Sequence, residues 1–167
     1  MLIIKIIVLQ AFWYAVVYSS FEYQLIFFLG SLIMTLLNYL IYIKHVDHLK
    51  YLFTVICFSI FGVYEILGAT YLGLIDYKNT DFAFWLLALY VVFACYYGDI
   101  FNYLASKHIS LLVLMGAFAG PLAFYGGVKI SNIEVLNNYY YIFIGLNWAV
   151  FFPLSIKIFY KDKSLIK

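Results

Sequence analysis

The chain has 167 residues, of which 67% are hydrophobic and 11% carry a charge, and its mean hydropathy is +1.00. This composition lies far outside the range of water-soluble domains and predicts an integral membrane protein. The formal net charge is only +2 and membrane topology explains the few lysines, so nucleic acid is not an expected partner. No linker or low-complexity segment interrupts the sequence, which indicates a single domain over residues 1–167.

Six apolar runs are long enough to cross the roughly 30 Å hydrocarbon core of a membrane as helices. They cover residues 2–19, 25–43, 51–75, 82–104, 109–128 and 139–158. We therefore predict an all-α fold in which six transmembrane helices form one bundle. The sequence has ten lysines and no arginine, and all but two of the lysines fall on the side that holds both termini. Because lysines are enriched in cytoplasmic loops, we expect a multi-pass membrane protein with both termini in the cytoplasm.

The first span carries an amide, Gln10, near its middle. In hydrocarbon such a side chain either forms a hydrogen bond between helices or lines a ligand cavity. Lys5 lies nearer the cytoplasmic end of this span. Its amine can extend to the lipid headgroups, or it can pair with Asp99, which we place at a similar depth in the fourth span.

The third span contains Glu65, one of two carboxylates within the spans. An ionised group at the bilayer centre costs about 2.5–3.5 kcal/mol, and no basic residue lies at this depth. We therefore expect Glu65 to be an uncharged acid that donates a hydrogen bond. Its partner is either a ligand or another helix, and Tyr64 beside it is a candidate for the same pocket.

The fourth span carries the second carboxylate, Asp99, and an amide, Asn102, three residues later. This spacing places both side chains on one helix face, where they form a candidate cavity wall. The depths of Asp99 and Glu65 differ by about 12 Å, so we predict two separate sites, each a candidate for catalysis.

The fifth span, within the sequence LLVLMGAFAGPLAFYGGV of residues 111–128, is rich in small residues. Gly116 and Gly120 form a G-x-x-x-G, and Ala119, Ala123 and Gly127 form a second row at spacing four. Two nearly bare helix flanks predict close packing against other helices. We expect this helix to lie centrally in the bundle and next to the third span. Its proline, Pro121, lies close to the depth estimated for Glu65.

Two further polar residues, Tyr125 and Asn147, lie within the fifth and sixth spans. A buried phenol or amide either ties helices together or faces a ligand. The full set of candidate ligand-binding residues is Gln10, Tyr64, Glu65, Asn102, Tyr125 and Asn147. We expect neither a metal nor a cofactor, because the sequence holds no phosphate-binding or metalloprotease motif and a zinc site needs three or four converging ligands.

Several segments together resemble the bacterial membrane family called domain of unknown function 2878 (DUF2878). They are Gln10 to Trp13, Glu65, residues 89–104, the run LMGAFAGPLAFYGGVKI, and Asn147 to Leu154. The most specific is G-x-x-G-P-L-A-[YF]-x-x-G, matched by residues 117–127 with Ala117 in place of the first glycine. The chain departs from the family pattern at residues 98–100, where Asn-His-Ser is common, so no role for Asp99 is carried over.

The resemblance implies a connection with lipids only by association, because genes of the family often accompany those for cyclopropane or other modified fatty acids. The first hypothesis is a lipid-associated protein that assists or performs acyl-chain modification, with Glu65 in an apolar pocket. The second is a small solute transporter or substrate-binding membrane subunit, since six spans in so short a chain also resemble components of vitamin uptake systems. The third is an assembly partner that docks another membrane protein on the fifth span. Whether the chain is an enzyme stays open, and the shape of the cavity distinguishes the three.

Overall fold

The computed structural model describes residues 2–19, 22–42, 48–78, 82–96, 101, 103–131 and 133–159. Within these residues the chain forms six helices and two short strands. The elements are α1 (Leu2–Tyr18), α2 (Gln24–Tyr42), α3 (His48–Tyr71), β1 (Ile75–Asp76), α4 (Phe84–Tyr96), α6 (Ile109–Ile130), β2 (Glu134–Val135) and α7 (Tyr139–Phe159). The expectation of an all-α fold with six helices is therefore confirmed.

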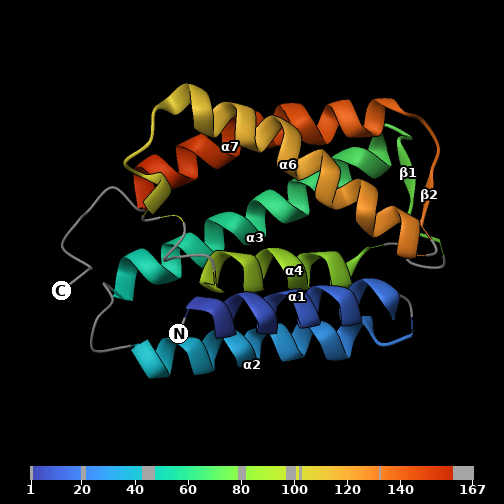
Figure 1. The fold of residues 1–167 in the computed structure, drawn as a ribbon. Coiled ribbons are helices and arrows are strands. Elements are labelled where there is room, and N and C mark those ends of the chain that lie inside the picture. Colours follow the sequence, from blue (N-terminus) through green and yellow to red (C-terminus); the bar gives the residue numbers. More distant parts are fainter. Residues whose placement is uncertain are drawn as a thin grey trace.

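The helices lie side by side, with α4 in the middle of the bundle (Figure 1). α4 packs against α1, α2 and α3, and α7 packs against both α3 and α6. At one end of the bundle β1 and β2 form an antiparallel pair, with Ile75 opposite Val135 and Asp76 opposite Glu134. This pair ties the α3–α4 connection to the α6–α7 connection. α1 begins and α7 ends at the opposite end of the bundle (Figure 1).

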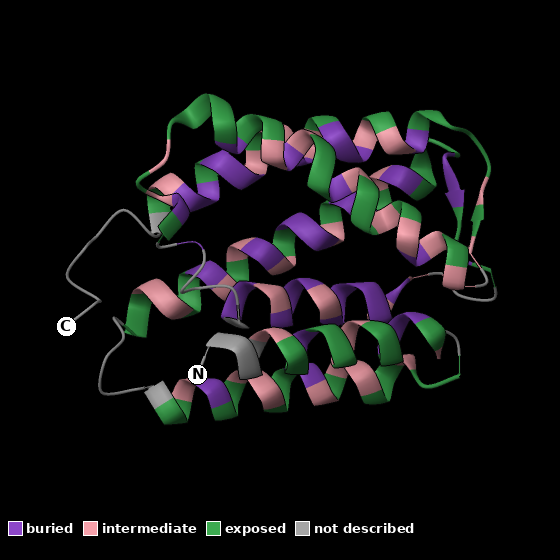
Figure 2. Cartoon of the chain, viewed as in Figure 1, coloured by how far each residue is buried: buried purple, intermediate pink, exposed green. Residues whose placement is uncertain are grey.

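The central helix is α4, and the prediction that residues 111–128 would occupy the centre was wrong. Most residues of α4 are buried, whereas only four residues of α6 are (Figure 2). Two of those four, Gly116 and Gly120, lie where α6 packs on α7. Small residues let two backbones approach closely at one contact, but they do not require burial on every side.

Within the part of the chain that the structure describes, four helices, α2, α3, α6 and α7, are long and apolar enough to cross a membrane. α1 and α4 are apolar but shorter. The described part of α4, Phe84–Tyr96, has 13 residues and extends over about 20 Å. Residues 97–100, which lie between it and the predicted end of the fourth span near Leu104, are outside the described residues. α2 exposes a long series of leucine and isoleucine side chains. An apolar surface of this extent is unusual for a soluble monomer and is typical of contact with lipid.

α3 ends at Tyr71, four residues before the predicted end of the third span. Gly73 has a φ of +63°, in the left-handed region where glycine carries no steric penalty. The amide of Leu74 donates to the carbonyl of Ala69 and that of Gly73 to Thr70, which is the hydrogen-bond pattern of a Schellman cap. The apolar run continues through this cap and then forms β1, so hydropathy alone extended the predicted helix too far.

Candidate functional site

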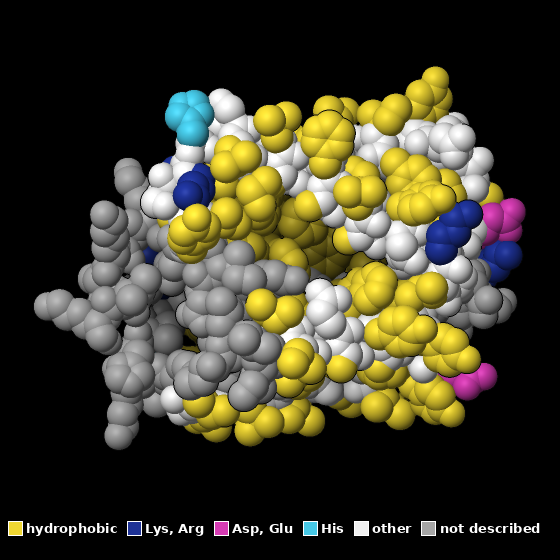
Figure 3. Space-filling model, in the orientation of Figure 1, with side chains coloured by type: hydrophobic (Ala, Val, Ile, Leu, Met, Phe, Trp, Pro, Cys, Tyr) yellow, Lys and Arg dark blue, Asp and Glu magenta, His cyan; other side chains and the backbone are white. Residues whose placement is uncertain are grey.

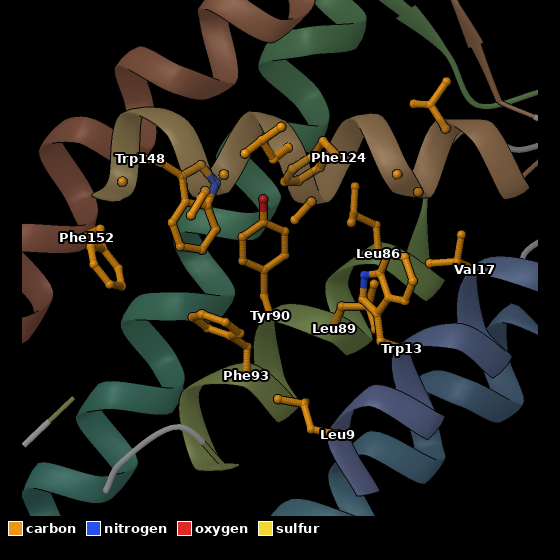
Figure 4. Close-up of a pocket in the computed structure, with 18 of the residues that line it drawn as sticks. Leu9, Trp13, Val17, Leu86, Leu89, Tyr90, Phe93, Phe124, Trp148 and Phe152 are labelled. Carbon is orange, nitrogen blue, oxygen red and sulfur yellow. The ribbon is translucent and has the colours of Figure 1, made fainter. Parts of the chain in front are cut away.

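A cavity of about 510 Å³ lies between α1, α4, α6 and α7. Figure 4 shows side chains from all four helices converging on this space, among them Trp13, Leu89, Phe124 and Trp148. In Figure 3 the helices run from left to right, and the molecule is seen from its side. A hollow lined with hydrophobic side chains is visible between α6 and α1. The cavity therefore opens on the side of the bundle.

The cavity lining is uncharged. None of the described residues that line it is Asp, Glu, Lys, Arg or His. Its polar groups are the amide of Gln10, the phenols of Tyr77, Tyr90 and Tyr140, and indole N–H groups. All three tryptophans of the chain, Trp13, Trp85 and Trp148, contribute to the wall. Such a lining suits the binding of a hydrocarbon group better than acid–base chemistry on a charged substrate.

The small residues of α6 create both the packing and the space. A Cβ atom added to Gly120 would lie 2.8 Å from Cγ of Trp148, and one added to Gly116 would collide with the carbonyl oxygen of Trp148. These two glycines let α7 approach. Ala119, Ala123 and Gly127 also line the cavity, and a Cβ atom added to Gly127 would lie 3.9 Å from both Trp13 and Val17 of α1. One flank of α6 thus contacts α7 and the other leaves a hollow toward α1.

Glu65 lies immediately behind the cavity wall, with a side chain only 1% exposed. Its Oε2 accepts hydrogen bonds from the hydroxyl of Tyr90 on α4 and from Nε1 of Trp148 on α7, the latter at 3.0 Å. The rings of Tyr90 and Trp148 are stacked, 6.0 Å apart, and both line the cavity. Glu65 therefore joins three helices and fixes the orientation of two rings of the wall.

This arrangement differs from the one predicted around Glu65. The expected neighbour of α3 was the helix of residues 111–128, but α3 and α6 have at most marginal contact and α7 packs against both. The prediction that the carboxyl is uncharged and donates a hydrogen bond stays a prediction, because Oε2 accepts from Tyr90 and Trp148 while Oε1, which can carry the proton, has no partner among the described residues. Gly62 of α3 faces the Tyr90 ring, so the small residues around Glu65 accommodate an aromatic side chain.

Asn147 lies beside Glu65 rather than in the cavity lining. Its Nδ2 is buried without a hydrogen-bond partner among the described residues, as is Oε1 of Glu65. The predicted polar contact of the sixth span therefore lies in the group formed by Glu65, Tyr90, Asn147 and Trp148, which we call the Glu65 cluster.

Tyr64 and Tyr125 lie on the outside of the bundle, and neither lines the cavity. Tyr64 is 53% exposed and packs beside Phe143, because consecutive helix residues are rotated by about 100° and Glu65 occupies the inward position. Tyr125 is 50% exposed, and the amine of Lys129 lies 5.4 Å from its ring centre.

Of the remaining candidates, Gln10 lines the cavity from α1. Asp99 and Asn102, and the side chain of Lys5, lie outside the described residues.

Sequence reasoning missed most of the aromatic side chains that form the site. Tyr90 and Trp85 fall in an apolar run with no polar periodicity, and Tyr140 lies at the start of a predicted span, where aromatic residues are common at the membrane surface. Trp148 directly follows Asn147 in a segment on which the family resemblance rests. That position was the one signal in the sequence that pointed to it.

A family model described as protein of unknown function (DUF2878) matches residues 2–154. The matched range contains all the residues that line the cavity and the whole Glu65 cluster. Neither the comparison with curated proteins nor the comparison with solved structures found a match. The family resemblance inferred from the motifs is confirmed, and the chain belongs to the DUF2878 family of proteins of unknown function.

Proposed function

We propose that this protein is a multi-pass membrane protein that binds the hydrocarbon chain of a lipid in its lateral cavity. The observation that carries the proposal is an uncharged cavity of about 510 Å³ that opens on the side of the bundle (Figure 3). A ligand can enter there from the surrounding acyl chains without crossing a polar surface. The volume lies within the range of sites that enclose small molecules.

The membrane arrangement belongs to the same proposal. All six helices cross the membrane, with α1 and α4 as the shorter spans. Both termini face the cytoplasm of a bacterial inner membrane, which agrees with the distribution of the lysines along the sequence. Lys107 and Lys157 lie at the end where α7 finishes, and the amine of Lys157 donates to the carbonyls of Ala105 and Lys107. Lys78 and Glu134 pair at 3.0 Å at the opposite end.

Within this function Glu65 is a positioning residue that holds the rings of Tyr90 and Trp148 against the ligand. The protein would assist acyl-chain modification if it presents the bound chain to a partner enzyme. It would perform the modification if the chain reacts in the cavity. Solute uptake is less favoured, because the lining is uncharged and the opening is lateral. Docking of another protein on the G-x-x-x-G of α6 is also less favoured, because Trp148 already covers Gly116 and Gly120.

The test is to fill the cavity without disturbing the fold. Gly126 lines the cavity, and a Cβ atom added there meets nothing within 4 Å, so Gly126→Phe projects a ring into free space. Gly30 on α2 has equally free surroundings but lies away from the cavity, which makes Gly30→Phe the matched control. Lipid retained through purification is then measured by native mass spectrometry.

We expect wild type and Gly30→Phe to retain lipid and Gly126→Phe to lose most of it. Equal retention by all three proteins would contradict binding in the cavity. Modification of the chain is tested separately by comparing the membrane lipids of cells with and without the gene. An unchanged acyl-chain profile, under conditions in which the protein is expressed, would exclude that role while leaving binding intact.

A further inference from the structure

One end of the cavity carries a hydrogen-bond donor that the fold does not use. Trp85, the second residue of α4, is 2% exposed and lines the cavity. Its Nε1 is buried and has no hydrogen-bond partner among the described residues. A buried indole N–H normally has a partner, because leaving water without a replacement bond is unfavourable. The other buried indole of the cavity, Trp148, which is 8% exposed, has its partner in Glu65.

Two phenols lie at the same end of the cavity. The rings of Tyr77 and Trp85 meet edge to face with centres 6.3 Å apart, and the side chain of Tyr140 lies close to that of Tyr77. Both tyrosines are buried, at 5% and 1% exposure, and both line the cavity. Tyr77 directly follows β1, and Tyr140 is the second residue of α7, so all three groups lie near the β1–β2 pair.

We infer that Tyr77, Trp85 and Tyr140 form a subsite that binds an uncharged oxygen acceptor, the ester carbonyl of an acyl lipid, at the strand end of the cavity. This inference rests on the proposed function and adds the chemical class of the ligand. The hydrocarbon chain lies along the apolar wall. The Trp85 N–H is closed off from the cavity in this structure, and a rotation of the indole ring lets it donate to the carbonyl.

The lining also discriminates between an ester and an ionised fatty acid. A carboxylate moved out of water needs a nearby cation, and no described residue that lines the cavity supplies one. An ester carbonyl needs only one or two neutral donors, which Trp85 and Tyr77 provide. A plain alkane would leave the Trp85 N–H without a partner and is the weaker ligand.

Tryptophan fluorescence of the full-length protein in nanodiscs measures this preference, because all three tryptophans line the cavity. The quenching probes are a brominated long-chain methyl ester, a brominated alkane of equal length and the corresponding ionised acid. The variants are Trp85→Phe, which removes the N–H, and Tyr77→Phe, which removes one hydroxyl and keeps all three fluorophores. Tyr64→Phe, which removes a hydroxyl outside the cavity, is the control.

In wild type and in Tyr64→Phe we expect the ester to bind more tightly than the alkane or the acid. Trp85→Phe should reduce the ester-to-alkane affinity ratio about three- to tenfold, the range expected for one hydrogen bond. Tyr77→Phe should shift it in the same direction, and it decides the test if Trp85→Phe does not fold. An unchanged ratio would overturn the subsite and leave hydrocarbon binding intact. Absence of quenching by any probe would overturn the proposed function as well.

Discussion

Replacement of Glu65 by leucine tests whether one carboxyl holds the cavity wall together. The change leaves two buried donors, the Tyr90 hydroxyl and the Trp148 N–H, without their acceptor. Each such group costs about 1–3 kcal/mol, or about 4 kcal/mol for the pair at mid-range. Loss of Oε1, which has no partner among the described residues, offsets about 2 kcal/mol of this. We therefore expect Glu65→Leu to lower the free energy of unfolding by about 2 kcal/mol.

Unfolding in mixed micelles with increasing SDS measures this loss, and two further variants identify its origin. Glu65→Gln keeps an amide oxygen that can accept both hydrogen bonds, so it should cost less than about 1 kcal/mol. Tyr90→Phe introduced into Glu65→Leu removes one orphaned donor and should recover part of the loss, which gives a positive coupling in a double-mutant cycle. If Glu65→Leu unfolds at the same SDS fraction as Glu65→Gln, the carboxyl does not organise the wall.

Two other substitutions test backbone geometry by the same unfolding measurement. Gly116→Ala should lower the free energy of unfolding by about 1–3 kcal/mol, because the new methyl group collides with the Trp148 carbonyl. Gly126→Ala meets no atom and should leave the free energy of unfolding unchanged. Equal stability of the two variants would contradict the α6–α7 contact. Gly73→Ala should lose about 1 kcal/mol because its φ is +63°, and Gly30→Ala on α2 should not; no difference between them would argue against the cap at the end of α3.

Hydropathy and length were sufficient to locate the helices. Each of the six observed helices falls on a predicted apolar run. Unpaired backbone N–H and C=O groups are costly in hydrocarbon, and a helix pairs all of them within one segment. The errors lie where a local signal opposed the apolar run. Gly73 ends α3 before the run ends, and the two-residue strands β1 and β2 are too short to leave a pattern.

The site was less predictable because it depends on which helix faces which. Glu65 was singled out correctly as a buried carboxyl, since its cost in hydrocarbon demands partners. Its partners, Tyr90 and Trp148, lie 25 and 83 residues away, and no local spacing relates them to it. Tyr64 was placed in the pocket by sequence adjacency, and the rotation of the helix carries it to the outer surface.

Occupation of the lateral cavity by a lipid chain can be detected by photo-crosslinking with a phospholipid that carries a diazirine in its acyl chain. Leu86 and Tyr90 line the cavity but are only 5% and 3% exposed, so a lipid chain reaches them only from inside the cavity. Ile33 on α2 is 59% exposed and reports contact with the surrounding bilayer. We predict adducts on Leu86 and Tyr90 that disappear in Gly126→Phe, with labelling of Ile33 unchanged. Adducts confined to outward-facing residues such as Ile33 would contradict the binding of a lipid chain in the cavity.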